Sequence, residues 1–197
     1  MPEYTVEELT SRENARIIKT AVTPRPIAWI SSLDDDGNEN LAPFSSYNYV
    51  VNTKPVLMFT SPAPGSGSMK DTARNIVETE EFAVNVVTRE NLETMDTTAA
   101  PLDPGESEFE YADVERASCR HISPPRVKDA VITMECTLHD TIEIYEKLMI
   151  LGDVVHYHID DAAMRDGKVD SREVATVGRL GGPYYTIAEP SPFERQF

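Results

Sequence analysis

Two long runs of strand-forming residues in the second half of the chain constrain its fold more than any other feature. Residues 131–145 (VITMECTLHDTIEIY) alternate between apolar and polar side chains over much of their length. Such a period of two is typical of a strand with one buried face. Residues 148–159 (LMILGDVVHYHI) follow after only Glu146 and Lys147. This spacing predicts an antiparallel pair and favours a mainly β fold.

Further strand candidates precede this pair, whereas helical patterns occur singly. A DDDGN turn at residues 34–38 is a strong hairpin signal. The expected strands cover residues 26–33, 39–51, 56–61 and 81–87, and the expected helices cover residues 6–22, a segment after Lys70, and residues 89–98. This order predicts a β-barrel with peripheral helices.

The chain has 197 residues and no evident linker, so we expect a single domain over residues 1–197. Within it, residues 1–22 contain the N-terminal helix and residues 189–197 form a C-terminal arm. The polar N-terminus is unlike a signal peptide, and no apolar run is long enough to cross a membrane. Two cysteines, Cys119 and Cys136, do not suggest a disulfide scaffold or a zinc site. A cytoplasmic location is the default expectation.

Acidic residues outnumber basic ones by 34 to 18, which gives a formal net charge of -16. Such a surface repels nucleic acid, so we expect no nucleic-acid partner. The acidic residues are scattered through every segment. This pattern fits a halophilic protein that works in a salt-rich cytosol, where screening weakens the repulsion. An ordinary acidic cytosolic protein is the alternative.

Residues 60–78 (TSPAPGSGSMKDTARNIVE) combine a loop of small residues with the start of a predicted helix. The first turn of a helix carries unpaired N–H donors and a partial positive charge. Lys70 adds a full charge and Thr72 a hydroxyl, and Asp71 lies between them. These are the parts of a phosphate site and suggest a phosphorylated cofactor. The alternative is that Asp71 or Thr72 only caps the helix.

Four stretches, taken in order, resemble the flavin reductase-like family, which has the FMN-binding split-barrel fold and includes the flavoredoxins. They are residues 25–61, residues 70–87, residues 105–115 (GESEFEYADVE) and residues 177–185 (VGRLGGPYY). The resemblance implies a six-stranded Greek-key split barrel that forms a homodimer. It also implies FMN bound near the dimer interface and electron transfer between NADH or NADPH, flavin and an acceptor.

The resemblance points to the Lys70–Asp71–Thr72 segment for the FMN phosphate, and to a tryptophan in the RPIAW segment near the flavin ring. Here that residue is Trp29, for which a core or interface position is the alternative. Arg25 could contact phosphate or pair with a carboxylate, and Thr23 could offer its hydroxyl to the ring edge.

Polar residues interrupt the strand-like segment after Phe44. Buried polar groups need partners, which a flavin ring edge and ribityl chain would supply. The residues are Ser45, Ser46, Tyr47 and Asn48. The alternative is the polar face of an edge strand. Ser61 could join the phosphate end of the site.

His121 follows an acidic segment and could meet the flavin or the nicotinamide, or lie on the surface. His156 and His158 share one strand face, but no third ligand can be placed beside them, so we expect no metal site. Cys119 and His121 could form a nucleophile pair, although nothing else in the chain supports acyl transfer.

The leading hypothesis is therefore an NAD(P)H:flavin oxidoreductase or flavoredoxin-like protein in which hydride passes to flavin N5. Because the flavin carries the chemistry, no catalytic side chain is expected. Reduced flavin could serve a partner monooxygenase or another redox acceptor. The alternatives are an FMN-binding electron carrier without its own NAD(P)H activity, and a split barrel that holds another cofactor such as a deazaflavin or haem.

Overall fold

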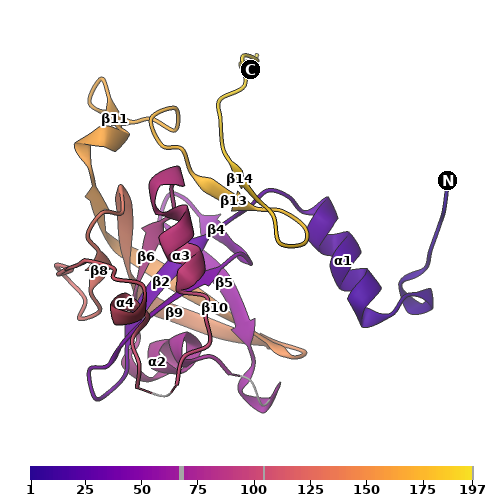
Figure 1. Cartoon of the computed structure of the whole chain (residues 1–197), viewed down its shortest axis with the longest axis horizontal. Coiled ribbons are helices and arrows are strands. Elements are labelled where there is room, and N and C mark those ends of the chain that lie inside the picture. Colours follow the sequence, from indigo (N-terminus) through magenta and orange to yellow (C-terminus); the bar gives the residue numbers. More distant parts are fainter. Residues whose placement is uncertain (67–68, 104, 197) are drawn as a thin grey trace.

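The computed structural model describes residues 1–66, 69–103 and 105–196. The N-terminal region contains two short helical pieces instead of one helix over residues 6–22. A 3₁₀ turn, η1 (Val6–Glu8), precedes the helix α1 (Ser11–Ala21). Each piece begins at a capping box, because the Thr–x–x–Glu spacing occurs twice in a row. Figure 1 shows α1 projecting from the body of the molecule.

Seven antiparallel strands form the main sheet, one more than predicted, and the mainly β class is confirmed. The sheet order is β3-β2-β6-β9-β10-β5-β4. The strands are β2 (Ala28–Leu33), β3 (Glu39–Phe44), β4 (Tyr47–Val51), β5 (Val56–Pro62), β6 (Glu81–Val86), β9 (Ile132–Ile144) and β10 (Lys147–Ile159). The predicted long hairpin is the β9–β10 pair, which turns at Tyr145 and Glu146.

The extra strand arises because residues 39–51 do not form one strand. The chain bends at Ser45 and Ser46, which separate β3 from β4. These two strands occupy opposite ends of the sheet order, yet only two residues join them. The sheet must therefore curl until its two edges meet at Ser45–Ser46, as in a barrel.

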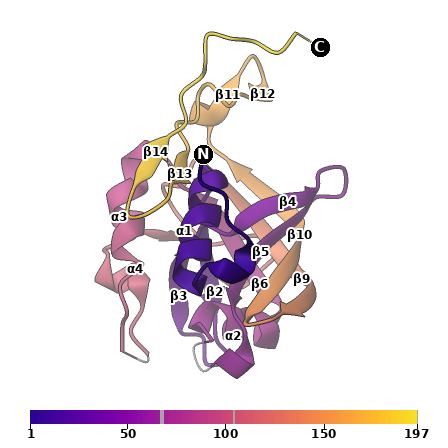
Figure 2. The same ribbon diagram turned by 90° about the vertical axis from the view of Figure 1, so that its right-hand side faces the viewer.

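Smaller elements surround this sheet (Figures 1 and 2). A small three-stranded sheet has the order β1 (Arg25–Pro26), β13 (Val177–Arg179), β14 (Tyr185–Ile187). Two short strand pairs are formed by β7 (Arg116–Ala117) with β8 (Arg126–Val127), and by β11 (Met164–Arg165) with β12 (Lys168–Val169). The remaining helical elements are η2 (Pro64–Ser66), α2 (Asp71–Thr79), η3 (Arg89–Asn91), α3 (Leu92–Thr97), α4 (Glu108–Tyr111) and η4 (Asp161–Ala163). None of the helices in the described parts of the chain is long and apolar enough to cross a membrane.

Two apolar clusters form the core, one on each face of β2. Ile30 packs with Phe59, Phe82 and Ile150 in the first cluster. Trp29, which directly precedes Ile30 in the strand, lies in the second cluster under the α3–α4 segment. Because successive strand residues point to opposite faces, β2 is buried on both sides. Strand β3 pairs with this buried strand, so its position and that of the Ser45–Ser46 connection after it depend on β2.

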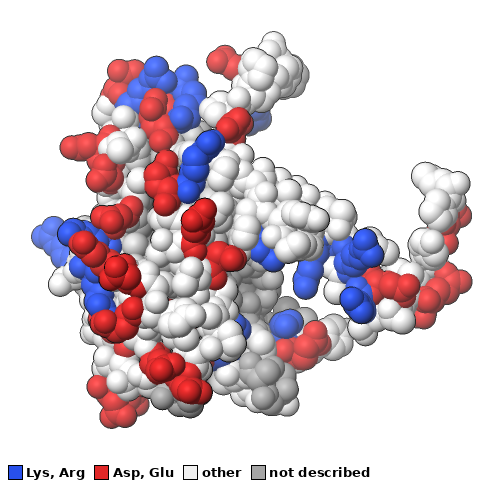
Figure 3. Space-filling view, viewed as in Figure 1, with Lys and Arg blue, Asp and Glu red and all other residues white. Residues whose placement is uncertain are grey.

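Figure 3 shows Asp and Glu spread over the visible face, while Lys and Arg gather on and beside α1. Arg12, Arg16 and Lys19 of α1 line a groove with the segment Gly181–Tyr184. After β14, residues 189–196 contain no helix or strand.

Candidate functional site

The start of α2 offers free hydrogen-bond donors, as the sequence predicts. Lys70 is the N-cap residue, with extended backbone angles, and its side chain makes no capping bond. The amides of Ala73 and Arg74 donate to the Lys70 carbonyl. The amides before them belong to the first turn, which has no acceptor within the helix. Lys70 itself is exposed, so both its ammonium group and this helix start can meet an anion.

Thr72 and Asp71 point in different directions. Thr72 is buried, and its Oγ1 accepts a hydrogen bond of 2.8 Å from Asn40 Nδ2. The Thr72 hydroxyl hydrogen is therefore left to donate to another group. Asp71 is exposed and pairs with Arg74. Of these two residues, Thr72 is the better placed to contact an anion.

A cleft of about 190 Å³ lies beside this helix start. Its lining includes Asn40, Ala42, Met69, Lys70 and Thr72, together with Asp71, Asp103, Glu106 and Glu108. Four carboxyl groups oppose an anion there. Burial raises the pKa of Glu108, although its Oε2 accepts a hydrogen bond from the Leu41 amide. The cleft is small, so it suits one end of a ligand rather than a whole mononucleotide.

Ser61 is a buried polar residue whose hydroxyl has no hydrogen-bond partner among the described residues. It follows Thr60 in β5, and the Thr60 amide donates to the Ser46 carbonyl at 3.0 Å. Ser61 therefore lies close to the β3–β4 connection. A buried hydroxyl without a partner is uncommon and marks a position where a ligand atom could bind.

A second pocket, of about 360 Å³, lies where Tyr47 and Asn48 begin β4. Its lining is mostly apolar and aromatic: Pro26, Tyr47, Asn48, Tyr49, Val51, Asn52, Pro55, Leu57, Met134, Val154 and Tyr157. Burial raises the pKa of Tyr47, so its phenol stays protonated. Asn48 Oδ1 accepts from the Tyr49 amide at 2.8 Å. A flat apolar ring with a polar edge fits such a lining.

Strand β3 links the two ends of this region. Asn40 and Ala42 line the cleft at α2, and Tyr47 lines the aromatic pocket just beyond the Ser45–Ser46 bend. From Asn40 to Phe44 an extended strand advances about 13 Å. That separation is comparable with the distance between the phosphate and the ring of an extended mononucleotide.

Trp29 does not reach this region, which corrects the expectation of a ring contact. Its side chain is 0% exposed, and its Nε1 donates to Thr98 Oγ1 at 2.9 Å. The ring is enclosed by the second core cluster. The alternative given for Trp29, a core aromatic, describes the structure.

The side chains of Arg25 and Thr23 both donate hydrogen bonds to backbone carbonyls at the end of α1. Arg25 Nη1 donates to the carbonyls of Lys19 and Val22, and its Nη2 donates to the Leu180 carbonyl. Arg25 therefore pairs with no carboxylate of the described residues, and its guanidinium donates to backbone carbonyls instead. Thr23 Oγ1 donates to the Thr20 carbonyl. Neither residue lines the cleft or the aromatic pocket.

His121 lies on a different face of the sheet from Tyr47. It is exposed in the loop between β7 and β8, and its amide donates to Glu135 Oε2 at 2.7 Å. Glu135 and Met134 are neighbours in β9 and so point to opposite faces. Met134 lines the aromatic pocket. The sheet therefore lies between His121 and that pocket, and the expected contact of His121 with substrate stays a prediction.

Several lining residues were not found from the sequence. Asn40, Met134 and Tyr157 lie in strands, and only the register of the sheet shows which face they occupy. The basic groove on α1 was detectable, because residues 12, 16 and 19 have helical spacing.

Comparison with known proteins places these observations in a family. Residues 20–174 match the family model described as the flavin reductase like domain. An uncharacterised protein of Aquifex aeolicus is 33% identical over 187 residues, which cover 94% of this chain and 95% of that protein. The structure of nitrilotriacetate monooxygenase component B from Bacillus cereus is similar, with a TM-score of 0.92, 30% identity, and coverage of 99% of this chain and 98% of that one. The 2-nitrobenzoate 2-nitroreductase of Pseudomonas fluorescens gives a TM-score of 0.88 at 28% identity, over 100% and 98% of the two chains.

Proposed function

The chain belongs to the flavin reductase-like family, and from this we propose that it is an FMN-binding oxidoreductase that uses NADH or NADPH as electron donor. The observation that carries the FMN assignment is the arrangement along β3. A helix start with free donors lies at one end of that strand, and an aromatic pocket lies beyond the other.

The residues near α2 suit the phosphate end of FMN. We assign Lys70 as the counter-charge and Thr72, with the first-turn amides, as hydrogen-bond donors. Ser61 does not line this cleft and is 1% exposed, so a ligand would reach its unpartnered hydroxyl only if the end of β5 opened. Asp71, through its ion pair with Arg74, stabilises the first turn of the helix instead of binding the ligand.

The residues after the Ser45–Ser46 bend suit the flavin ring. Tyr47 and Tyr157 supply flat apolar contacts, and Asn48 supplies amide donors for the polar edge. Ser45 and Ser46 lie between the two ends, where hydroxyl groups would meet the ribityl chain. When bound, the flavin supplies the redox chemistry by accepting a hydride at N5. The protein binds and orients both reactants, so no catalytic acid or base is assigned.

We further propose that the working form is a homodimer. No residue of α1 is buried, and its apolar residues Ile17 and Ile18, with the C-cap residue Val22, are between 50% and 59% exposed. An amphipathic helix that projects from its own chain leaves an apolar face without a partner (Figure 1). A second copy of the chain would cover it. The aromatic pocket is also rimmed by exposed Tyr49 and Val51, so a partner would bury that side.

The fate of the electrons is proposed from one relative. The B. cereus protein is named as component B of a monooxygenase. A similar role would let this chain supply reduced flavin to a separate monooxygenase. A bound flavin that serves another redox acceptor is the second possibility, and release of the flavin on reduction would distinguish the first from the second.

The test begins with the visible spectrum of the purified protein, which separates FMN from haem or a deazaflavin. Oxidation of NADH and of NADPH is then followed with FMN added. Turnover with either nicotinamide supports the reductase. Bound FMN without turnover would identify an electron carrier, and a protein that neither contains nor binds FMN would refute the proposal.

A further inference from the structure

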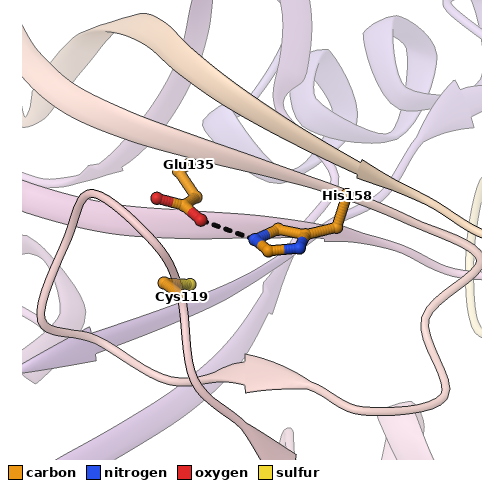
Figure 4. A group of neighbouring side chains, drawn as sticks. All are labelled: Cys119, Glu135 and His158. Atoms are coloured by element: carbon orange, nitrogen blue, oxygen red, sulfur yellow. Dashed lines mark hydrogen bonds and ion pairs between the residues drawn. The ribbon is translucent and has the colours of Figure 1, made fainter.

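A cluster of metal-ligating side chains lies outside the proposed flavin site. Cys119 is in the loop between β7 and β8, Glu135 is in β9 and His158 is in β10. One ligand atom from each, the Cys119 Sγ, a Glu135 carboxylate oxygen and a His158 ring nitrogen, lies within 4.8 Å of the others. In Figure 4 the Glu135 carboxylate and the His158 ring point toward each other, with Cys119 beside them.

The cluster lies on the outer face of the β9–β10 pair. Glu135 faces away from the barrel interior, which its neighbour Cys136 fills as part of the first core cluster. The loop that carries Cys119 covers this outer face. Three separate segments therefore bring a sulfur, an oxygen and a nitrogen donor together, although the sequence alone offered no third ligand beside the histidines.

The carboxylate of Glu135 is held in place by the backbone. Its Oε1 accepts from the Arg120 amide and its Oε2 from the His121 amide, both at 2.7 Å. The side chain of Glu135 is 0% exposed. Backbone donors of this kind orient carboxylate ligands in metal sites. Each carboxylate oxygen has a second lone pair, so the Oε1 atom can bind both the amide and a cation.

The distances between the ligand atoms require only a small movement of the side chains for a zinc ion to bind. His158 Nε2 and Glu135 Oε1 are 2.5 Å apart and share a proton. Donors bound to one zinc ion lie roughly 3–4 Å apart, because Zn–N bonds are about 2.0 Å and Zn–S bonds about 2.3 Å long. The two side chains must therefore separate by about 1 Å. His158 is partly exposed, which leaves space for this shift and for a water as fourth ligand.

We propose that Cys119, Glu135 and His158 form a binding site for a thiophilic divalent cation of the Zn²⁺ type. Thiolate, imidazole and carboxylate are the three donor types that zinc takes in proteins, and calcium or magnesium would not select a thiolate. Binding releases the thiol proton to solvent and needs a free lone pair on His158 Nε2, so the ring takes the tautomer with its proton on Nδ1. With three protein ligands, the site keeps one position for water.

The experiment uses the full-length protein, first freed of metal with a chelator. Zn²⁺ is then titrated in competition with a chromophoric chelator, and Co²⁺ is added separately to look for a thiolate charge-transfer band in the difference spectrum. We expect one zinc ion per chain. Cys119→Ala and His158→Ala should each weaken zinc binding by more than about tenfold, the cost typical of losing even an outer-shell partner.

His139→Ala is the matched control. His139 Nδ1 pairs with Asp153 Oδ2 at 2.8 Å on the same two strands, but no cysteine joins that pair. This variant should bind zinc like the wild type. The proposal is overturned if the wild type does not bind zinc, if the two cluster variants bind it equally well, or if His139→Ala loses it to the same extent.

Two melting experiments distinguish variants that lose a zinc ligand from variants that no longer fold. The Cys119 thiol makes no hydrogen bond within the described parts of the chain, so Cys119→Ala should melt at the wild-type temperature without zinc. Zinc should raise the melting temperature of the wild type and His139→Ala only, because a cation that binds the native state stabilises it. An equal rise in Cys119→Ala would contradict the assignment. FMN binding by the same proteins is measured independently and tests the flavin site alone.

Discussion

Trp29 supports the fold through both its ring and its indole N–H. The ring lies in the second core cluster, and its Nε1 donates to Thr98 Oγ1, which in turn donates to the Met95 carbonyl. The indole therefore ties β2 to the end of α3. Residues of this kind contribute to stability and only indirectly to ligand binding.

Replacing Trp29 should therefore affect stability more than cofactor binding. Trp29→Ala should lower the free energy of unfolding by about 3–5 kcal/mol, because it leaves a cavity. Trp29→Phe should cost about 1–3 kcal/mol by leaving Thr98 without its donor. Urea denaturation measures both. Tyr145→Ala, at a side chain that is 91% exposed, is the control and should change little. Equal stability of Trp29→Ala and the wild type would contradict this role.

Replacing Lys70 should have the opposite effect, because it should change cofactor binding more than stability. Lys70→Ala should weaken FMN binding by about 1–3 kcal/mol, the usual cost of a charge-assisted hydrogen bond, and leave stability nearly unchanged. Quenching of flavin fluorescence during titration measures the affinity. The control is Lys168→Ala in the β11–β12 hairpin, where the lysine is also exposed. If both variants bind FMN like the wild type, Lys70 does not contact the phosphate.

Strand β10 contains a glycine whose lack of a side chain is essential for packing. A Cβ atom at Gly152 would lie 2.3 Å from Phe82 Cζ and 2.8 Å from its Cε1. The Phe82 ring is buried in the first core cluster, where it packs edge-on against Phe59. The ring cannot move without displacing its neighbours, so this close approach of strand and ring requires glycine.

Gly152→Ala should consequently destabilise the protein by about 1–3 kcal/mol or more, through overpacking. Thermal or urea unfolding measures the loss. Gly65→Ala is the matched control, because a Cβ there meets no atom within 4 Å. A stable Gly152→Ala protein would mean that β10 can shift away from Phe82.

Local signals were enough to predict some elements and not others. The β9–β10 hairpin follows from alternation and a short turn, and α2 follows from its capping position and apolar spacing. The break at Ser45–Ser46 was missed, because the polar residues there were interpreted as ligand contacts or as one face of a continuous strand, and the bend becomes evident only from the order of the sheet. The family resemblance gave the barrel, but it did not give the face on which each residue lies.

In the candidate site too, residues that are neighbours in sequence were easier to predict than residues that only the whole fold brings together. The proposed phosphate end is contiguous in sequence, so Lys70 and Thr72 were candidates from the sequence alone. The aromatic pocket joins β1, β4, β5, β9 and β10, and its members depend on strand register. The sequence therefore could not place His121 relative to this pocket, nor could it bring together the three segments that meet at the Cys119 cluster.

If the chain forms the proposed dimer through α1, charged substitutions on the apolar face of α1 should change its oligomeric state. Replacing both Ile17 and Ile18 with Glu should convert the dimer to a monomer, since it places charge in the apolar face of the helix. Light scattering coupled to gel filtration measures the mass. Val169→Glu, at another exposed apolar residue, should remain dimeric. A wild-type monomer would refute the proposed assembly.

The net charge of -16 predicts a response to salt. If the surface is adapted to a salt-rich cytosol, the melting temperature should rise as KCl approaches molar concentrations, because screening weakens the repulsion between carboxylates. Scanning calorimetry over a KCl series measures the trend. A falling melting temperature would count against halophilic adaptation.

The two-residue link between β3 and β4 has a consequence for how the proposed flavin site forms. The first and last strands of the sheet are consecutive in the chain, so the curled sheet is complete only when the five strands between them are paired as well. Ser45–Asn48 lie where its two ends are joined. FMN uptake during refolding should therefore report completion of the whole barrel, and it should lag behind signals from the β9–β10 hairpin.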